Sequence, residues 1–191
     1  MGELHREYRD FVGFYWTLPL PAFGFTKLPD FPDEAARASR TIRYQREAVR
    51  RYVAERKGRL ADEVVFLEIH PDRSSDGVEP YVERALRSCQ KHHAQLVFVD
   101  FAREHGWRSH PWMSRLMHLA PISCLGLDPE PVVIDGEPFD PIGHFRTMKA
   151  AAESRGSPAD RRAALAALVA DVVAEMRGAA PGRRCARSRS G

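Results

Sequence analysis

The chain has 191 residues, of which 43% are hydrophobic and 29% charged, and this predicts one globular domain with a sizeable core and some additional terminal structure. The formal net charge is only +3, and the C-terminal arginines Arg183, Arg184, Arg187 and Arg189 contribute +4 by themselves, so attraction for a polyanion is expected at that end rather than on the nearly neutral body. Three widely spaced cysteines fit neither a disulfide framework nor a CxxC metal site, which favours a reducing cytoplasm. No signal peptide and no run of about 18 to 20 apolar residues is found, so we expect a cytoplasmic protein without a membrane partner.

The first predicted element is a strand over residues 11–18, FVGFYWTL, which is stopped by Pro19 and Pro21. The loop over residues 19–33 is unusually long for a compact domain, and such loops tend to be functional or disordered. A single long helix is predicted over residues 34–57, with Gly58 as its left-handed cap. The arginines of this helix could meet phosphates, but we expect them to form a solvated face because Glu47 and Glu55 are interspersed among them.

The centre of the chain, residues 63–100, has the pattern of two buried parallel strands joined by a helix. Residues 64–67 and 96–99 are unbroken apolar runs, and the residues at helical spacing between them are Val82, Ala85, Leu86 and Cys89. Strands covered on both faces show such runs, and parallel strands require a crossover helix. This segment therefore predicts a βαβ unit around which the rest of the fold is built.

Further elements are predicted after this unit. They are a helix over 109–119 with Ser109 as its N-cap, a strand over 122–127, and a hairpin that begins at 132–134 and turns at Asp135-Gly136. Helices follow over 140–155 and 157–178, and a basic tail over 179–191 is expected to be disordered. The prediction is an α/β fold in three layers, with a mostly parallel sheet of four or five strands. Its parts are a body over 1–156, a C-terminal helix over 157–178 and the tail.

Few side-chain patterns point to chemistry. The eight histidines include the pair His92-His93 and also His105 and His110, but no cysteine pair or HExxH motif accompanies them, so we expect no metal site. The glycine-rich motifs that hold dinucleotides or nucleotide phosphates are missing, as is the GxSxG nucleophile motif, and we expect no cofactor.

Two pairs of residues remain as weak catalytic candidates. Ser74 and Ser75 follow the second strand and could belong to an active-site loop, although an N-cap for the next helix is the favoured interpretation. Asp100 follows the third strand, with Arg103 within reach, and the carboxyl ends of strands are where open α/β sheets place functional groups.

Two segments carry a family resemblance. The segment YQREAVRRY, residues 44–52, resembles the first helix of the catalytic domain of serine recombinases of the resolvase and invertase family. The segment VERALRSCQKHHAQLV, residues 82–97, resembles that family's second helix and third strand. The resemblance covers roughly residues 11–155, and it implies a resolvase-like fold and site-specific DNA recombination by a serine nucleophile.

The active-site positions depart from the family's pattern. Where the family has Tyr-x-Arg-x-Ser on its first strand, this chain has Tyr15, then Thr17 in place of the arginine and Pro19 in place of the serine. Glu79-Pro80 stands for the family's Arg-Pro, and after Asp100 both arginines of the family's Asp-Arg-Leu-x-Arg motif are replaced, by Phe101 and Glu104. Phosphoryl transfer needs a nucleophile and a cationic cradle, and these positions supply neither.

The sequence therefore predicts a resolvase-like domain that has lost strand transfer and serves as a DNA-associated or regulatory binding module, with DNA, a second copy of the chain or a related recombinase as its partner. Two alternatives stay open. One is an active recombinase or other enzyme with a rearranged active site drawn from Ser74, Ser75, Asp100 and Arg103. The other is a protein–protein interaction module that binds no nucleic acid. For DNA, the expected binding residues are the four arginines of the tail.

Overall fold

The structure is a computed structural model that describes residues 8–19, 26–69, 75–102 and 110–144. Its elements in chain order are β1 Asp10–Thr17, α1 Pro32–Ala38, α2 Arg40–Glu55, β2 Arg59–Leu67, the 3₁₀ helix η2 Asp76–Val78, α3 Glu79–His92, β3 Gln95–Val99, α4 Pro111–Leu119, β4 Cys124–Leu127, β5 Val132–Ile134 and β6 Glu137–Phe139.

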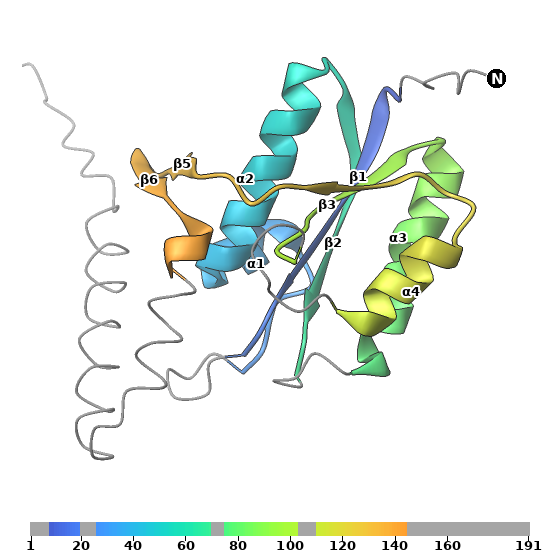
Figure 1. Ribbon diagram of the computed structural model, residues 1–191, viewed down its shortest axis with the longest axis horizontal. Helices are drawn as coiled ribbons and strands as arrows, with labels where there is room; N and C mark the ends of the chain where they lie inside the picture. Colours follow the sequence, from blue (N-terminus) through green and yellow to red (C-terminus); the bar gives the residue numbers. More distant parts are fainter. Residues whose placement is uncertain (1–7, 20–25, 70–74, 103–109, 145–191) are drawn as a thin grey trace, which may run out of the picture. The chain divides into compact units, whose positions relative to one another are not determined.

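Four strands form an all-parallel sheet in the order β2-β1-β3-β4 (Figure 1). Helices α1 and α2 cover one face, and α3 and α4 cover the other, as the crossover connections of a parallel sheet require. The predicted three-layer α/β fold is confirmed. In the βαβ unit of β2, α3 and β3, the two strands are separated by β1, and β2 is an edge strand. Strands β5 and β6 form a separate antiparallel pair.

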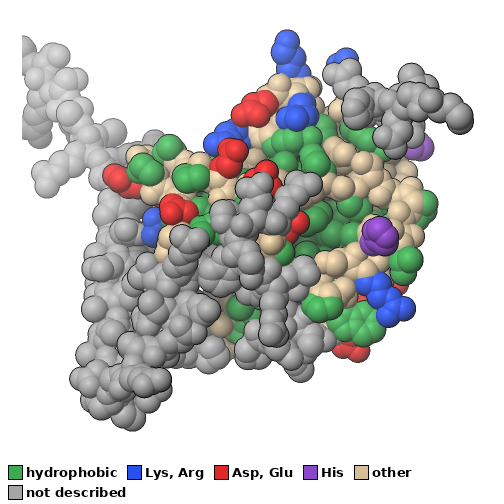
Figure 2. Space-filling view, viewed as in Figure 1, with side chains coloured by type: hydrophobic (Ala, Val, Ile, Leu, Met, Phe, Trp, Pro, Cys, Tyr) green, Lys and Arg blue, Asp and Glu red, His purple; other side chains and the backbone are tan. Residues whose placement is uncertain are grey.

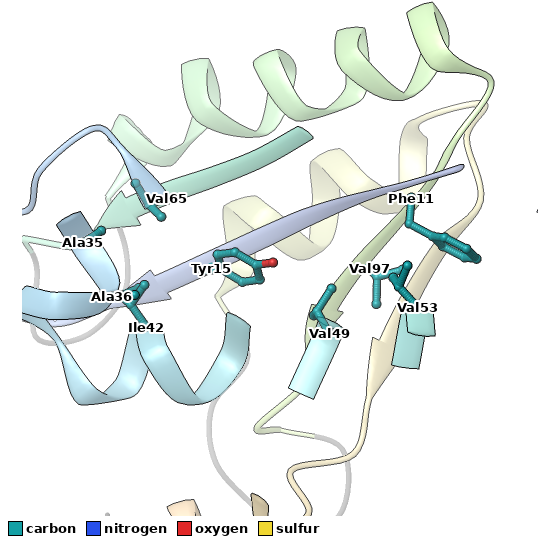
Figure 3. Close-up of a cluster of buried hydrophobic side chains, with 9 residues drawn as sticks. All are labelled: Phe11, Tyr15, Ala35, Ala36, Ile42, Val49, Val53, Val65 and Val97. Carbon is teal, nitrogen blue, oxygen red and sulfur yellow. The ribbon is translucent and has the colours of Figure 1, made fainter. Parts of the chain in front are cut away.

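Buried side chains between the sheet and α2 form one face of the core (Figure 3). They come from the strands and from both helices of this layer, and they are Phe11, Tyr15, Ala35, Ala36, Ile42, Val49, Val53, Val65 and Val97. The Tyr15 ring lies back along β1 over Gly13, where an added Cβ would stand 2.2 Å from the phenol oxygen. Gly13 therefore provides the space in which the largest side chain of this cluster lies.

The predicted single helix over 34–57 is wrong, because the structure breaks it into α1 and α2 at Ser39. The backbone of Ser39 is extended, with φ −135° and ψ 119°, and its hydroxyl accepts a hydrogen bond from the N–H of Ile42 at 3.3 Å. A serine in this conformation is a helix N-cap, and it competes with continuation of the preceding helix. Ser39 therefore ends α1 and starts α2 in one step.

The predicted glycine cap of this helix is also wrong, since Lys57 and not Gly58 has the left-handed conformation, with φ 51°. The N–H groups of Lys57 and Gly58 donate to the carbonyls of Ala54 and Val53, each at 2.9 Å, which is the Schellman pattern. Gly58 is needed for another reason: an added Cβ would lie 2.4 Å from the Phe11 ring. The glycine lets β1 approach the end of α2.

The predictions for residues 110–144 agree with the structure where it describes them. Strand β4 and the hairpin of β5 and β6 are confirmed, and positive φ angles at Asp135 and Gly136 give the predicted primed turn. Residues 141–144 are helical, and the Asp140 carboxylate accepts from the N–H of Ile142 at 3.0 Å. The predicted C-terminal helix over 157–178 and the tail over 179–191 lie outside the described residues.

Candidate functional site

Polar residues gather where the four parallel strands end. Thr17 ends β1, and Glu68, Asp100 and Asp128 directly follow β2, β3 and β4. The chain runs from β1 outward to β2 and then returns past β1 to β3, so the strand order reverses between β1 and β3. Open α/β sheets bind ligands outside the carboxyl ends of the strands at such a reversal. This edge is the candidate functional site.

The most buried polar pair of the site joins β2 to α4. Glu68 and His110 both have 0% exposed side chains, and the His110 Nε2 atom lies 2.5 Å from the Glu68 Oε2 atom. The N–H of Met113 donates to His110 Nδ1 at 3.4 Å, so Nδ1 is the acceptor and Nε2 carries the proton donated to Glu68. His110 therefore caps α4, in the place that the sequence assigned to Ser109, which lies outside the described residues.

A cavity of about 500 Å³ opens beside this pair, between α4 and the sheet. Its described lining combines aromatic and thioether groups with a few polar ones, namely Trp16, Phe98, Val99, Asp100, Phe101, Ala102, His110, Met113, Ser114, Met117, His118, Ala120, Ile122 and Cys124. The Trp16 ring meets the imidazole of His110 edge to face, with centroids 5.9 Å apart. The volume lies within the range of small-molecule sites, and the lining surface is about evenly polar and apolar.

Asp100, a predicted candidate, lies at the wall of this cavity. Its Oδ1 atom accepts a hydrogen bond from the N–H of Ala102 at 2.9 Å, and this turns the chain after β3. An added Cβ on Gly126 would lie 2.9 Å from the Asp100 Cβ, so the glycine of β4 lets Asp100 lie against the neighbouring strand. Its candidate partner Arg103 lies outside the described residues.

Of the two serine candidates, the structure describes Ser75 but not Ser74. Ser75 is buried, and its hydroxyl accepts from the N–H of Gly77 at 3.0 Å, so it caps η2 as the favoured interpretation predicted. Ser74 lies outside the described residues, as do the tail arginines Arg183, Arg184, Arg187 and Arg189. Asp100 and His110 therefore line the same cavity. The sequence analysis considered His110 only as a possible metal ligand.

The positions that the family resemblance aligns with the catalytic strand have other contacts here. Tyr15 is fully buried, and its hydroxyl donates to Glu63 Oε1 at 3.0 Å. Burial, followed by the nearby charge of Glu63 and the hydrogen bond to it, raises the pKa of Tyr15 well above its usual value. Thr17 is 8% exposed and its hydroxyl bonds only weakly to the carbonyl of Leu18, at 3.5 Å. Glu79 is the first residue of α3.

The arginines of α2 are held by partners within the fold. Arg46 forms a two-fold hydrogen bond with Glu63, at 2.8 Å and 3.0 Å, and also contacts Asp33 at 2.5 Å. The remaining pairs are Arg40 with the Phe139 ring, Arg43 with Asp135, Arg50 with Glu63, Arg51 with Glu130 and Arg56 with the Tyr52 ring. In Figure 2 blue and red side chains are interspersed on the visible face. The predicted solvated face is thus a set of ion pairs and ring contacts, with Arg46 buried.

Metal and thiol chemistry find little support in the described part of the chain. No group of three or more His, Cys, Asp and Glu residues there is arranged to hold a metal ion. Burial raises the pKa of Cys89 to about 12 and that of Cys124 to about 11, so neither thiol ionises readily at neutral pH. Among the described helices, none is long and apolar enough to cross a membrane.

Sequence reasoning missed Glu68 altogether. The available signal was a carboxylate placed directly after the buried run of β2, together with a histidine directly before Pro111 at the start of a helix. Both positions flank predicted elements at the same edge of the sheet. Searches against protein-family models, curated proteins and solved structures found no match for this chain.

Proposed function

We propose that this chain is a resolvase-like domain that has lost DNA strand transfer and acts as a DNA-associated binding module. The observation that carries the loss of strand transfer is the set of residues that directly follow the strands at the carboxyl edge of the sheet. In the described residues, the side chains that directly follow β2, β3 and β4 are Glu68, Asp100 and Asp128. A transferring phosphate requires cations at such a position, and carboxylates repel it.

The contacts of α2 support the same conclusion. Cations that could have formed a phosphate cradle are engaged elsewhere, and Arg46 in particular is bound by two carboxylates. The position aligned with the family's nucleophile is Pro19, which has no nucleophilic group. The strand order β2-β1-β3-β4 is compatible with the resemblance in residues 44–52 and 82–97. DNA association then depends on the tail arginines, which no acidic residue accompanies.

The first prediction is that the purified chain neither cleaves supercoiled DNA nor becomes covalently joined to it. A phosphoseryl bond needs a positioned hydroxyl and a cationic cradle, and Pro19 and Glu79 stand at the two relevant positions. The measurement is a plasmid nicking assay, together with denaturing electrophoresis of labelled DNA after incubation with the protein. A denaturant-resistant adduct that disappears in Ser74→Ala or Ser75→Ala would favour the rearranged active site and contradict the proposal.

The second prediction concerns how DNA binding depends on salt. We expect the affinity for duplex DNA to fall steeply with salt, and the slope of log affinity against log salt to shrink by about 0.9 for each tail arginine that contacts a phosphate. The test compares the full chain with a variant in which Arg183, Arg184, Arg187 and Arg189 are changed to Gln. The control is Arg87→Gln, because Arg87 is exposed on α3 and paired with Glu83.

Two results would contradict this prediction. An unchanged slope in the tail variant would move the nucleic-acid contact to the body of the domain. No measurable binding at low salt would remove DNA from the function and leave the protein–protein interaction module as the remaining candidate.

A further inference from the structure

The described lining of the cavity beside α4 includes aromatic and thioether side chains. Phe98 of β3 pairs in register with Gly126 of β4, so no side chain rises from the neighbouring strand beside the Phe98 ring. The sulfur-bearing side chains of Met113 and Met117 reach in from α4, and Trp16 of β1 also lines the space. Aromatic and thioether groups on opposite sides of a cavity favour a flat ring between them.

Asp100 is a carboxylate among the described residues that line this cavity. Asp100 Oδ1 is occupied by the N–H of Ala102, while Oδ2 has no hydrogen-bond partner in the part of the chain that the structure describes. A carboxylate keeps about four lone-pair sites and can accept two parallel N–H groups at once. The described residues that line the cavity include no Lys or Arg.

Another part of the described lining is held by the buried pair Glu68 and His110. His110 is bonded through both ring nitrogens, to Glu68 and to the N–H of Met113, so its ring presents carbon edges to Trp16 and to the cavity. The imidazole thus holds the first turn of α4 at a set distance from the sheet.

From this combination we propose that the cavity binds a flat heteroaromatic molecule whose edge carries two adjacent N–H donors, the pattern of a guanine-type base. The ring lies between Phe98 and the two methionines, and its donor edge faces Asp100. The proposal is independent of DNA association, because it uses a different surface and a different kind of charge.

Guanosine is the probe, and inosine is its matched control because it lacks only the exocyclic amino group. Binding to the full chain is measured by isothermal titration calorimetry. We expect inosine to bind about tenfold more weakly than guanosine, since it cannot form one hydrogen bond to the charged carboxylate. Equal affinities, or no heat of binding for either compound at millimolar concentration, would overturn the proposal.

Amino-acid substitutions test whether guanosine binds in this cavity. Asp100→Asn keeps an oxygen for the N–H of Ala102 and should lower guanosine affinity at least about tenfold, whereas Asp128→Asn, at the end of β4, should not. Ser114→Phe introduces a ring into the cavity from the exposed side of α4 and should abolish binding without lowering the melting temperature. Wild-type affinity in either Asp100→Asn or Ser114→Phe would refute the site.

Two further ligands distinguish a free nucleoside from a nucleotide or a nucleic acid as the molecule that carries the base. Guanosine monophosphate and a short guanine-containing single strand carry the same base with added phosphates. We expect both to bind no tighter than guanosine, because the lining residues that the structure describes include no Lys or Arg to meet the phosphate. Tighter binding of either ligand that persists in Asp100→Asn would contradict the proposed recognition by the carboxylate.

Discussion

Changing Glu63 to Ala is expected to lower the free energy of unfolding by about 3 kcal/mol, because it leaves the largely buried Arg46 guanidinium without its main partner. The side chains of Arg46 and Glu63 are only 10% and 14% exposed, and Glu63 also accepts from the Tyr15 hydroxyl inside the core. The measurement is urea denaturation followed by circular dichroism. Glu83→Ala is the control, since it removes an exposed pair with Arg87 and should cost less than about 0.5 kcal/mol.

A double variant checks the cause of this loss. Glu63→Leu combined with Arg46→Met removes both charges and keeps apolar volume, so it should recover most of the stability that Glu63→Ala loses. If the double variant is as unstable as the single one, packing or the lost acceptor of the Tyr15 hydroxyl, and not the unpaired charge, accounts for the effect.

The pH dependence of this pair follows from the pKa of Glu63. Burial raises that pKa, but the hydrogen bond and charge of Arg46 outweigh burial and hold it below its ordinary value of 4.5. The stabilisation is therefore complete above pH 4.5 and is lost as the pH falls through the lowered value. Glu63→Ala lacks this contribution, so its stability should fall less steeply in acid than that of the unaltered chain.

Changing His110 to Ala is expected to lower the free energy of unfolding by about 3 to 5 kcal/mol, because it removes a hydrogen-bond partner of the fully buried Glu68 and the ring that packs on Trp16. His118→Ala, on the exposed side of the same helix, should change stability by no more than about 0.5 kcal/mol. Both variants are compared by thermal and urea unfolding.

The coupling between the two buried groups can be isolated with Glu68→Ala and the double variant. A coupling energy above about 1 kcal/mol is expected for side chains in direct hydrogen-bonded contact. Additive losses in the double variant would mean that His110 stabilises α4 without acting on Glu68.

Strands β1, β3 and β4 were predictable because short unbroken apolar runs are typical of strands that are buried on both faces. Strand β2 was predicted too short, because its first half carries Arg59, Asp62 and Glu63, and polar residues of an edge strand hide its period. The break at Ser39 was missed because the apolar spacing of α1 and α2 continues across it. The break depends on the extended backbone conformation of Ser39, and the spacing of apolar residues carries no information about that conformation.

The candidate site was less accessible to sequence reasoning. Asp100 was found by its place after a strand, and a general rule about sheet edges suffices for that. The bond between Glu68 and His110 joins residues 42 positions apart and depends on how α4 packs, which no local pattern records. The burial of Tyr15 against Glu63 is likewise a tertiary contact, across 48 positions.

The parallel arrangement of β1 has a consequence for how the chain folds. Phe11 pairs with Leu60 on one side and with Gln95 on the other, so β1 is synthesised before both of its partners and acquires them only after the two crossovers have been made. Parallel pairing across long loops is intrinsically slow, and β1 is buried from Phe11 to Thr17 in the native state. During synthesis this strand is an exposed apolar edge, and nascent chains that stop before β3 should be the ones that aggregate.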